Sequence, residues 1–250
     1  MENNKNAYLI PASIVLAGII IGYAWINASW RTVPDNQIKS ENQPSTAQSV
    51  ELPVVWGNLG AQMISAGVID RARFEAIYES RGGLSGADKK LLENLQNGNL
   101  TANQENSGLL LNLFWALGLG NKNEILEKGP MSDPRYGGAG GFASTGGWTL
   151  AKGDAMNHYG MHSFMILTPK QQALVEKVSK NIYRPCCDNP THFPDCNHGM
   201  AMLGLLELLA SQGASEDEMY RAAFQMNSFW FPDQYATIAK YFASKGVKIQ

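Results

Sequence analysis

The side chains best suited to bind metals or exchange electrons are concentrated in one part of this chain. All three cysteines and all four histidines lie between Asp154 and Met202. These residues are Cys186, Cys187, Cys196, His158, His162, His192 and His198. A random scatter over the chain would rarely give such a cluster. Because thiols and imidazoles bind soft and borderline metals, and thiols also carry redox chemistry, the clustering predicts one chemical site.

The densest part of the cluster is the segment CCDNPTHFPDCNH, which begins at Cys186 and ends at His198. Prolines stiffen this segment, which suits a preformed site. The pattern Cys-Cys-x8-Cys-x-His supplies three sulfurs and one nitrogen, the ligand count of a tetrahedral Cys3His zinc site, and His192 is a substitute ligand. Cys196 and His198 begin the next expected helix, whose N-terminal dipole favours a thiolate. We therefore predict a bound metal ion, with zinc as the first choice.

Other chemistries of the same segment stay open at this stage. Met200 and Met202 would add thioether sulfur, which suits Cu(I), unless both methionines belong to a helix core. An odd number of cysteines in an oxidising compartment also allows one disulfide and one free thiol. In that case Cys196 would pair with Cys186 or Cys187, either as a redox-active bond or as a structural staple of the loop.

A second group of candidate ligands precedes this segment. Asp154, His158 and His162 are spaced four residues apart, so they would share one face if residues 152–164 formed a helix. Two histidines on such a face can bind Zn or Cu together. A zincin-type hydrolase would need Glu directly after the first histidine, and Tyr159 occupies that position. The alternative is that both histidines hydrogen-bond the loop backbone.

Charge and motifs exclude several functions. The 250 residues carry a formal net charge of −2, which gives no electrostatic basis for binding nucleic acid. The Gly-rich segment 129–150 lacks the Gly-Lys-Ser/Thr ending of a P-loop, because Lys152 is followed by Gly153. We expect a surface loop there, or a lid over the Cys/His stretch. No catalytic triad or carboxylate pair at catalytic spacing is evident, so we assign no enzymatic activity.

The remaining pattern is helical. Capping boxes at Thr168–Gln171 and Ser215–Glu218 mark two helix starts. The apolar segment 103–119 is expected to be a buried core helix rather than a membrane span. The expected helices cover residues 71–80, 86–97, 103–119, 121–128, 169–182, 198–211, 216–227 and 232–244. The chain is therefore predicted to be mainly α, with a compact helical domain over residues 53–250 that carries a Gly-rich and a Cys/Pro-rich loop.

The N-terminal residues predict a membrane anchor. The run from Tyr8 to Ile26 carries no charge and has about the length that crosses a bilayer. No good signal-peptide cleavage site follows it, so we expect an uncleaved anchor over residues 1–30. Residues 31–52 are rich in Pro, Asn, Gln and Ser, which is typical of a flexible tether. This arrangement predicts a single-pass membrane protein whose helical domain lies outside the cytoplasm.

Two parts of the chain resemble known families. The run IPASIVLAGIIIGYAW, within residues 10–25, resembles the N-terminal anchors of membrane-tethered, thioredoxin-like bacterial disulfide oxidoreductases. The last third, with its helix, Cys-bearing loop and apolar helix, resembles the thiol-oxidoreductase subunit of cytochrome c maturation. That family carries Cys-x-x-Cys, whereas RPCCDNP has adjacent cysteines at 186 and 187. No catalytic residue can therefore be transferred from the family.

The sequence favours a membrane-anchored extracytoplasmic protein that binds Zn or Cu through its Cys/His cluster. The alternatives are a thiol-disulfide redox protein that uses the same cysteines, and a structural or interaction module stapled by a disulfide. The membrane is the expected partner, and a protein partner stays open.

Overall fold

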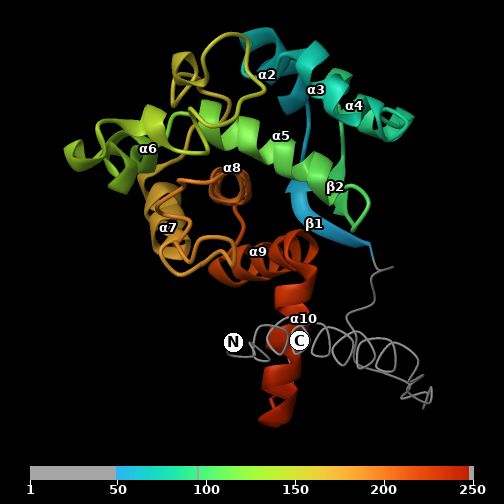
Figure 1. Ribbon diagram of the computed structural model, residues 1–250, viewed down its shortest axis with the longest axis vertical. Coiled ribbons are helices and arrows are strands. Elements are labelled where there is room, and N and C mark those ends of the chain that lie inside the picture. The colour runs from blue at the N-terminus through green and yellow to red at the C-terminus, as the bar shows by residue number, and fades with distance from the viewer. Residues whose placement is uncertain (1–48, 95, 248–250) are drawn as a thin grey trace, which may run out of the picture. The chain divides into compact units, whose positions relative to one another are not determined.

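The computed structural model describes residues 49–94 and 96–247, and these residues are mainly helical, with one small sheet (Figure 1). The chain divides into two units, residues 1–43 and 44–250, and the described residues belong to the second. The expected anchor at Tyr8 to Ile26 lies outside them. Among the described residues, no helix combines the length and the apolar character needed to cross a bilayer.

The elements follow one another along the chain in a mainly helical order. The strands are β1 (Val50–Val55) and β2 (Asn99–Ala102). The helices are α2 (Leu59–Ala66), α3 (Arg71–Glu79), α4 (Gly86–Glu93), α5 (Ser107–Gly120), α6 (Glu124–Lys128), α7 (Pro169–Ser179), α8 (Asn197–Ser211), α9 (Glu216–Trp230) and α10 (Pro232–Ser244). The expected capping boxes at the starts of α7 and α9 are confirmed.

The core is built around two apolar helices, α5 and α8, which pack against each other. Almost every residue of both helices is buried, as expected for helices that are apolar on all sides. Gly118 and Gly204 face each other at the contact. A Cβ added at either position would collide with a backbone carbonyl of the other helix, Met200 for Gly118 and Phe114 for Gly204. The two glycines therefore allow α5 and α8 to approach each other closely.

The sheet was not expected from the sequence. β1 pairs antiparallel with β2, with Val50 opposite Ala102, and its first residues fall in the segment assigned to the tether. Leu52 and Val54 alternate with exposed neighbours and point into the core. Gln212 holds the end of β1, because its side chain accepts from the Val55 N–H at 2.8 Å and donates to the Val55 carbonyl at 2.7 Å.

The segment before α7 does not meet the condition for a shared face of Asp154, His158 and His162, and its Gly-rich part is not the plain surface loop that the sequence suggested. Residues 152–164 do not form a helix, and only a 3-10 turn, Ala155–Asn157, is present. Gly153 and Gly160 have φ values of 74° and 64°, which interrupt a right-handed helix. The Gly-rich segment is also not wholly at the surface, because Ser144 and Thr145 are buried. Trp115 of α5 donates its indole N–H to the Ser144 carbonyl at 2.9 Å, which fixes this segment to the core.

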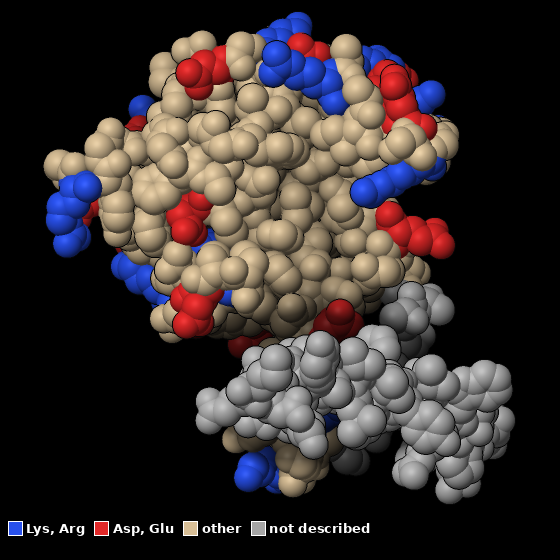
Figure 2. Space-filling view, in the orientation of Figure 1, with Lys and Arg blue, Asp and Glu red and all other residues tan. Residues whose placement is uncertain are grey.

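Charged side chains do not gather into a patch of one sign on the face shown in Figure 2. Lys, Arg, Asp and Glu lie mostly toward the margins of the described residues, around a broad uncharged centre. This distribution agrees with the small formal net charge of −2.

Candidate metal centre

The cysteines lie on a loop between α7 and α8, and backbone contacts set its shape. The Arg184 carbonyl accepts from the N–H groups of Cys187 and Asp188, at 3.3 and 2.9 Å, which closes a tight turn. Asp188 has a φ of 54°, the one positive value among the described non-glycine residues. Farther along, the Thr191 N–H donates to the Ile182 carbonyl at 2.8 Å. The two adjacent cysteines are therefore held at the tip of a closed turn.

The second arm of the loop is held by the Gly-rich segment. The Ser144 hydroxyl donates to the Pro194 carbonyl at 2.7 Å, and the Ser144 N–H donates to the Asp195 carbonyl at 3.0 Å. The ring of Phe193 also stacks on Tyr136, with centroids 5.5 Å apart. Cys196 is the N-cap residue of α8. The Gly-rich segment thus positions the third cysteine rather than covering the site as a free lid.

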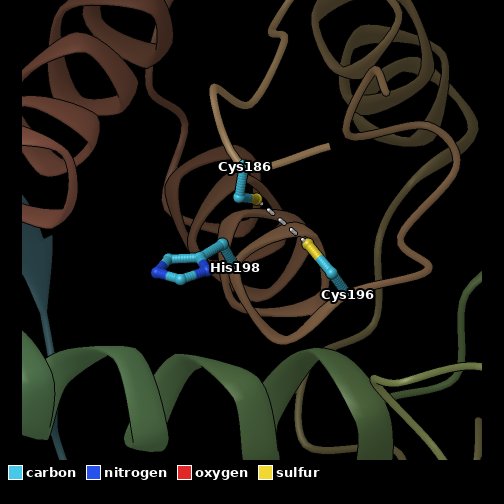
Figure 3. A group of neighbouring side chains, drawn as sticks. All are labelled: Cys186, Cys196 and His198. Atoms are coloured by element: carbon cyan, nitrogen blue, oxygen red, sulfur yellow. Dashed lines mark hydrogen bonds between the residues drawn. The ribbon is translucent and has the colours of Figure 1, made fainter. Parts of the chain in front are cut away.

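The three sulfur atoms form a nearly equilateral triangle. The Sγ of Cys186 lies 3.6 Å from the Sγ atoms of both Cys187 and Cys196, and the third side is 3.7 Å. Figure 3 shows the Cys186 and Cys196 side chains pointing toward each other. These separations are far from the ~2.05 Å of a disulfide, so all three cysteines are free in this structure. We call this group the sulfur triangle.

The dimensions of the sulfur triangle suit a metal ion. Three thiolates of a tetrahedral zinc site, with Zn–S bonds of about 2.3 Å, lie about 3.8 Å from one another. The observed sides of 3.6 and 3.7 Å are close to that value. The Cys/His group is therefore geometrically able to hold a metal ion.

Two residues flank the sulfur triangle as sources of a fourth ligand. Ligand atoms of Cys186, Cys196 and His198 all lie within 4.8 Å of one another, and so do those of Cys187, Asp195 and Cys196. Burial and the Arg184 charge lower the pKa of His198 to about 4, so its imidazole is neutral and has a lone pair at neutral pH.

The two flanking residues differ in the contacts that their side chains already make. The His198 ring points away from the two sulfurs drawn in Figure 3 and packs against Phe231, with centroids 4.5 Å apart. Asp195 accepts from Arg184 at 2.6 Å through Oδ1 and from Asn189 at 2.8 Å through Oδ2. Because both carboxylate oxygens have partners, Asp195 is better placed to support the loop than to bind an ion.

A buried arginine lies beside the sulfur triangle. Arg184 is 1% exposed, and its Nε donates to the Sγ of Cys187 at 3.4 Å. Its Nη2 donates to Asp195 and to the Phe193 carbonyl at 3.0 Å. Nη1 has no partner among the described residues and lies against Gly199. The guanidinium therefore joins both arms of the loop and places a fixed positive charge next to the sulfurs.

The thiols differ in their tendency to lose a proton. Burial alone would raise the pKa of Cys187, but the Asn189 backbone N–H and the Arg184 guanidinium together lower it below its usual value. Burial raises the pKa of Cys186 and of Cys196, and the negative charge of a neighbouring thiolate adds to the rise. Cys187 is therefore the thiol that most readily becomes a thiolate in the absence of a metal ion.

The remaining histidines lie outside the sulfur triangle. His192, the expected substitute ligand, lines a separate open hollow with Lys128 and Asp133. Asp154 caps the 3-10 turn by accepting from the Met156 N–H at 2.9 Å. His158 and His162 are adjacent, with Nδ1 and Nε2 3.0 Å apart, although no helix brings them together. The alternative that these histidines hydrogen-bond the loop backbone holds for His158, whose Nε2 lies 3.1 Å from the Lys152 carbonyl oxygen.

The two methionines near the cysteines belong to the helix core. Met200 and Met202 are fully buried in the α8 core, which confirms the core alternative for both.

Sequence reasoning missed Arg184, Asn189 and Asp195. A signal was present, because Arg184 stands two residues before the first cysteine and Asp195 directly before the last. Only the folded loop brings these two positions together.

Comparisons with known proteins add no assignment, because no family model, no curated protein and no solved structure matches this chain.

Proposed function

We propose that this chain is a metal-binding protein in which the sulfur triangle of Cys186, Cys187 and Cys196 holds one Zn²⁺ ion. The near-equal sulfur separations of 3.6, 3.6 and 3.7 Å carry the proposal. Hydrogen bonds between free thiols give only a weak cause for this convergence, because sulfur is a weak donor and a weak acceptor. A shared cation gives the convergence a cause, since each thiolate then gains from approaching it.

The size of the sulfur triangle favours zinc over Cu(I). Three thiolates in a plane around an ion, at bonds of about 2.3 Å, would be about 4.0 Å apart, whereas a tetrahedral ion brings them to about 3.8 Å. The observed sides of at most 3.7 Å are closer to the second arrangement. A tetrahedral ion takes a fourth ligand outside the sulfur plane, and the neutral His198 imidazole is the nearest candidate.

Such an ion would have a structural consequence. Cys186 and Cys187 belong to the turn after α7, and Cys196 begins α8. A metal ion would link these segments by bonds that form only in the folded chain, so its binding free energy would add to the stability of the fold.

We also propose that residues 8–26 anchor this domain to a membrane, because that run carries no charge.

The test is the metal content of the full chain. Protein purified under reducing conditions with Zn²⁺ should hold close to one ion per chain by elemental analysis. Cys187→Ser should lose it, while His192→Ala, a matched control outside the sulfur triangle, should keep it. A wild-type chain with well under one ion, or a Cys187→Ser variant that keeps its ion, would refute the proposal.

A second function has one observation in its favour. The Cys187 thiol has a lowered pKa, and the Cys196 sulfur is 3.7 Å away. Its thiolate could attack an external disulfide and release one thiolate, and Cys196 could resolve the mixed disulfide by releasing the second thiol. Oxidised glutathione added to metal-free protein should then yield two reduced glutathione molecules per chain. Zinc-loaded protein that reacts equally fast would favour this redox function over metal binding.

A further inference from the structure

A second concave site is lined in part by Tyr183, the residue before Arg184 in the chain. It has a volume of about 310 Å³, and its lining residues come from the chain after α7, from α9 and from the start of α10. This volume is at the lower end of the range of ~300–1,000 Å³ seen for ligand pockets. The side chains that give it chemical character are Asn181, Tyr183, Tyr220, Phe224, Asn227 and Tyr235.

The cleft presents aromatic rings to solvent. Tyr183 is 56% exposed and Phe224 is 39% exposed, although both are large apolar side chains. The rings of Phe224 and Tyr235 meet edge to face, with centroids 5.4 Å apart. Among the described residues that line the cleft, none carries a charge at neutral pH. A charged ligand would lose water here without finding an opposite charge, so the lining selects against ions.

One buried polar atom in this lining lacks a partner. Asn227 is 2% exposed, and its Oδ1 accepts no hydrogen bond from the described residues. Burial raises the pKa of the Tyr235 hydroxyl, and the nearby Asn227 side chain opposes that rise. The carbonyl oxygen of Asn227 is a buried acceptor that a ligand could satisfy.

We infer that this cleft binds a neutral sugar unit. The C–H face of a pyranose ring packs on exposed aromatic rings, and its hydroxyl groups donate to an amide oxygen such as Oδ1 of Asn227. Both features are present in one uncharged cleft. A proline-rich peptide fits less well. Proline has no N–H, so such a peptide offers mainly carbonyl acceptors, whereas Oδ1 of Asn227 needs a hydrogen-bond donor.

The residues that line the cleft include no cysteine, so the cleft shares no sulfur ligand with the candidate metal centre. Tyr183 is next to Arg184 in the chain, so metal content should be measured in every variant. Loss of sugar binding with full metal content would then concern the cleft alone. Loss of metal in the wild-type chain would concern the proposed zinc site and would leave the sugar proposal standing.

The experiment uses the full chain and three neutral disaccharides, namely cellobiose, maltose and N,N′-diacetylchitobiose. Saturation-transfer NMR should show contact with at least one of them, and titration should give a dissociation constant on the order of 1 mM. Asn227→Leu keeps a side chain of similar size but removes the acceptor, so binding should weaken at least about tenfold. Tyr183→Ala should weaken it similarly, because the change removes an exposed ring.

Tyr241→Ala is the matched control, since Tyr241 is 60% exposed on α10 and does not line the cleft. It should bind sugar as the wild type does. Asn227→Leu removes an unsatisfied buried atom, so a thermal melt at or near that of the wild type would show that lost binding is not lost folding. The inference is overturned if none of the disaccharides binds at about 50 mM, if the Tyr241→Ala control loses binding as the cleft variants do, or if a proline-rich peptide binds through Tyr183 and the sugars do not.

Discussion

Gly199 lies directly against the guanidinium of Arg184 at the point where the sulfur triangle meets α8. A Cβ at position 199 would overlap Nη1 and crowd the central guanidinium carbon. The absence of a side chain there allows a buried cation to reach Cys187 and Asp195 at once. Glycine at this position is therefore part of the candidate metal centre, although it supplies no ligand.

Gly199→Ala should destabilise the fold by about 1–3 kcal/mol, the usual cost of overpacking a buried site. The measurement is urea denaturation of the full chain in the presence of a metal chelator. Gly108→Ala is the matched control, because Gly108 is also near the start of a helix but has open space around its Cβ position. That variant should be as stable as the wild type or more stable by up to ~1 kcal/mol. Equal stability of the two variants would contradict the role given to Gly199.

Arg184→Met should change both stability and thiol chemistry. Removal of the cation leaves the Asp195 carboxylate with Asn189 alone, at a cost of about 2–3 kcal/mol. That value is below the range for fully buried pairs, because 19% of the Asp195 side chain is exposed. The pKa of Cys187 should rise, since the guanidinium lowers it in the wild type. Alkylation of the metal-free protein by iodoacetamide should therefore need a higher pH, and an unchanged pH profile would refute this account.

Helix positions were largely readable from the sequence because their signals are local. The capping box Thr168–Gln171 and the proline at position 232 mark helix starts through contacts within one turn. The sheet was missed because its pairing joins β1 to β2 across about fifty residues, and its stability comes from packing rather than from local preference. The spacing of Asp154, His158 and His162 would have placed them on one face only in a helix, and the positive φ values of Gly153 and Gly160 prevent a helix over residues 152–164.

The candidate site was only partly predictable for the same reason. The density of cysteine and histidine pointed to the loop in which the three sulfurs converge, but density does not say which side chains converge. His192 belongs to the same thirteen residues as the cysteines and yet faces a different hollow. Arginine is not a metal-binding residue type, so a search for metal ligands does not select Arg184. Its role depends on Asp195, eleven residues away, and only the closed turn brings the two together.

A buried acid in the core should make stability depend on pH. Glu207 of α8 is fully buried, and burial raises its pKa well above the ordinary value of 4.5, while the hydrogen bond from Asn121 opposes the rise. The folded state therefore keeps a proton that the unfolded state releases above about pH 4.5. Because the folded state binds more protons, stability should fall as pH rises from that value until the folded pKa is passed.

Glu207→Gln should remove this contribution. Glutamine is nearly the same size, is neutral at every pH, and can still accept from the Asn121 Nδ2 group, which lies 2.5 Å from Oε2 in the wild type. The comparison is the free energy of unfolding of both proteins from pH 5 to pH 8. The wild type should lose stability relative to the variant as pH rises, whereas parallel curves would show that Glu207 has no raised pKa.

The identity of the fourth ligand gives the sharpest test of the metal centre. If His198 binds the ion, His198→Gln should weaken Zn²⁺ binding by more than about 100-fold. Asp195→Asn should weaken it by only about 10–100-fold, as expected for a group that orients ligands rather than binding the metal. His192→Gln should have no effect, because His192 lies at a separate hollow.

Co²⁺ in place of Zn²⁺ gives a readout besides affinity, because its visible bands report the ligand geometry and its near-ultraviolet bands report thiolate bonding. His198→Gln should alter the visible bands and keep the thiolate bands, since the three sulfurs remain. Cys196→Ser should reduce the thiolate bands, because it removes one corner of the sulfur triangle. If Asp195→Asn alters the visible bands and His198→Gln does not, the fourth ligand lies on the Asp195 side, and the Arg184–Asp195 pair must open when the metal binds.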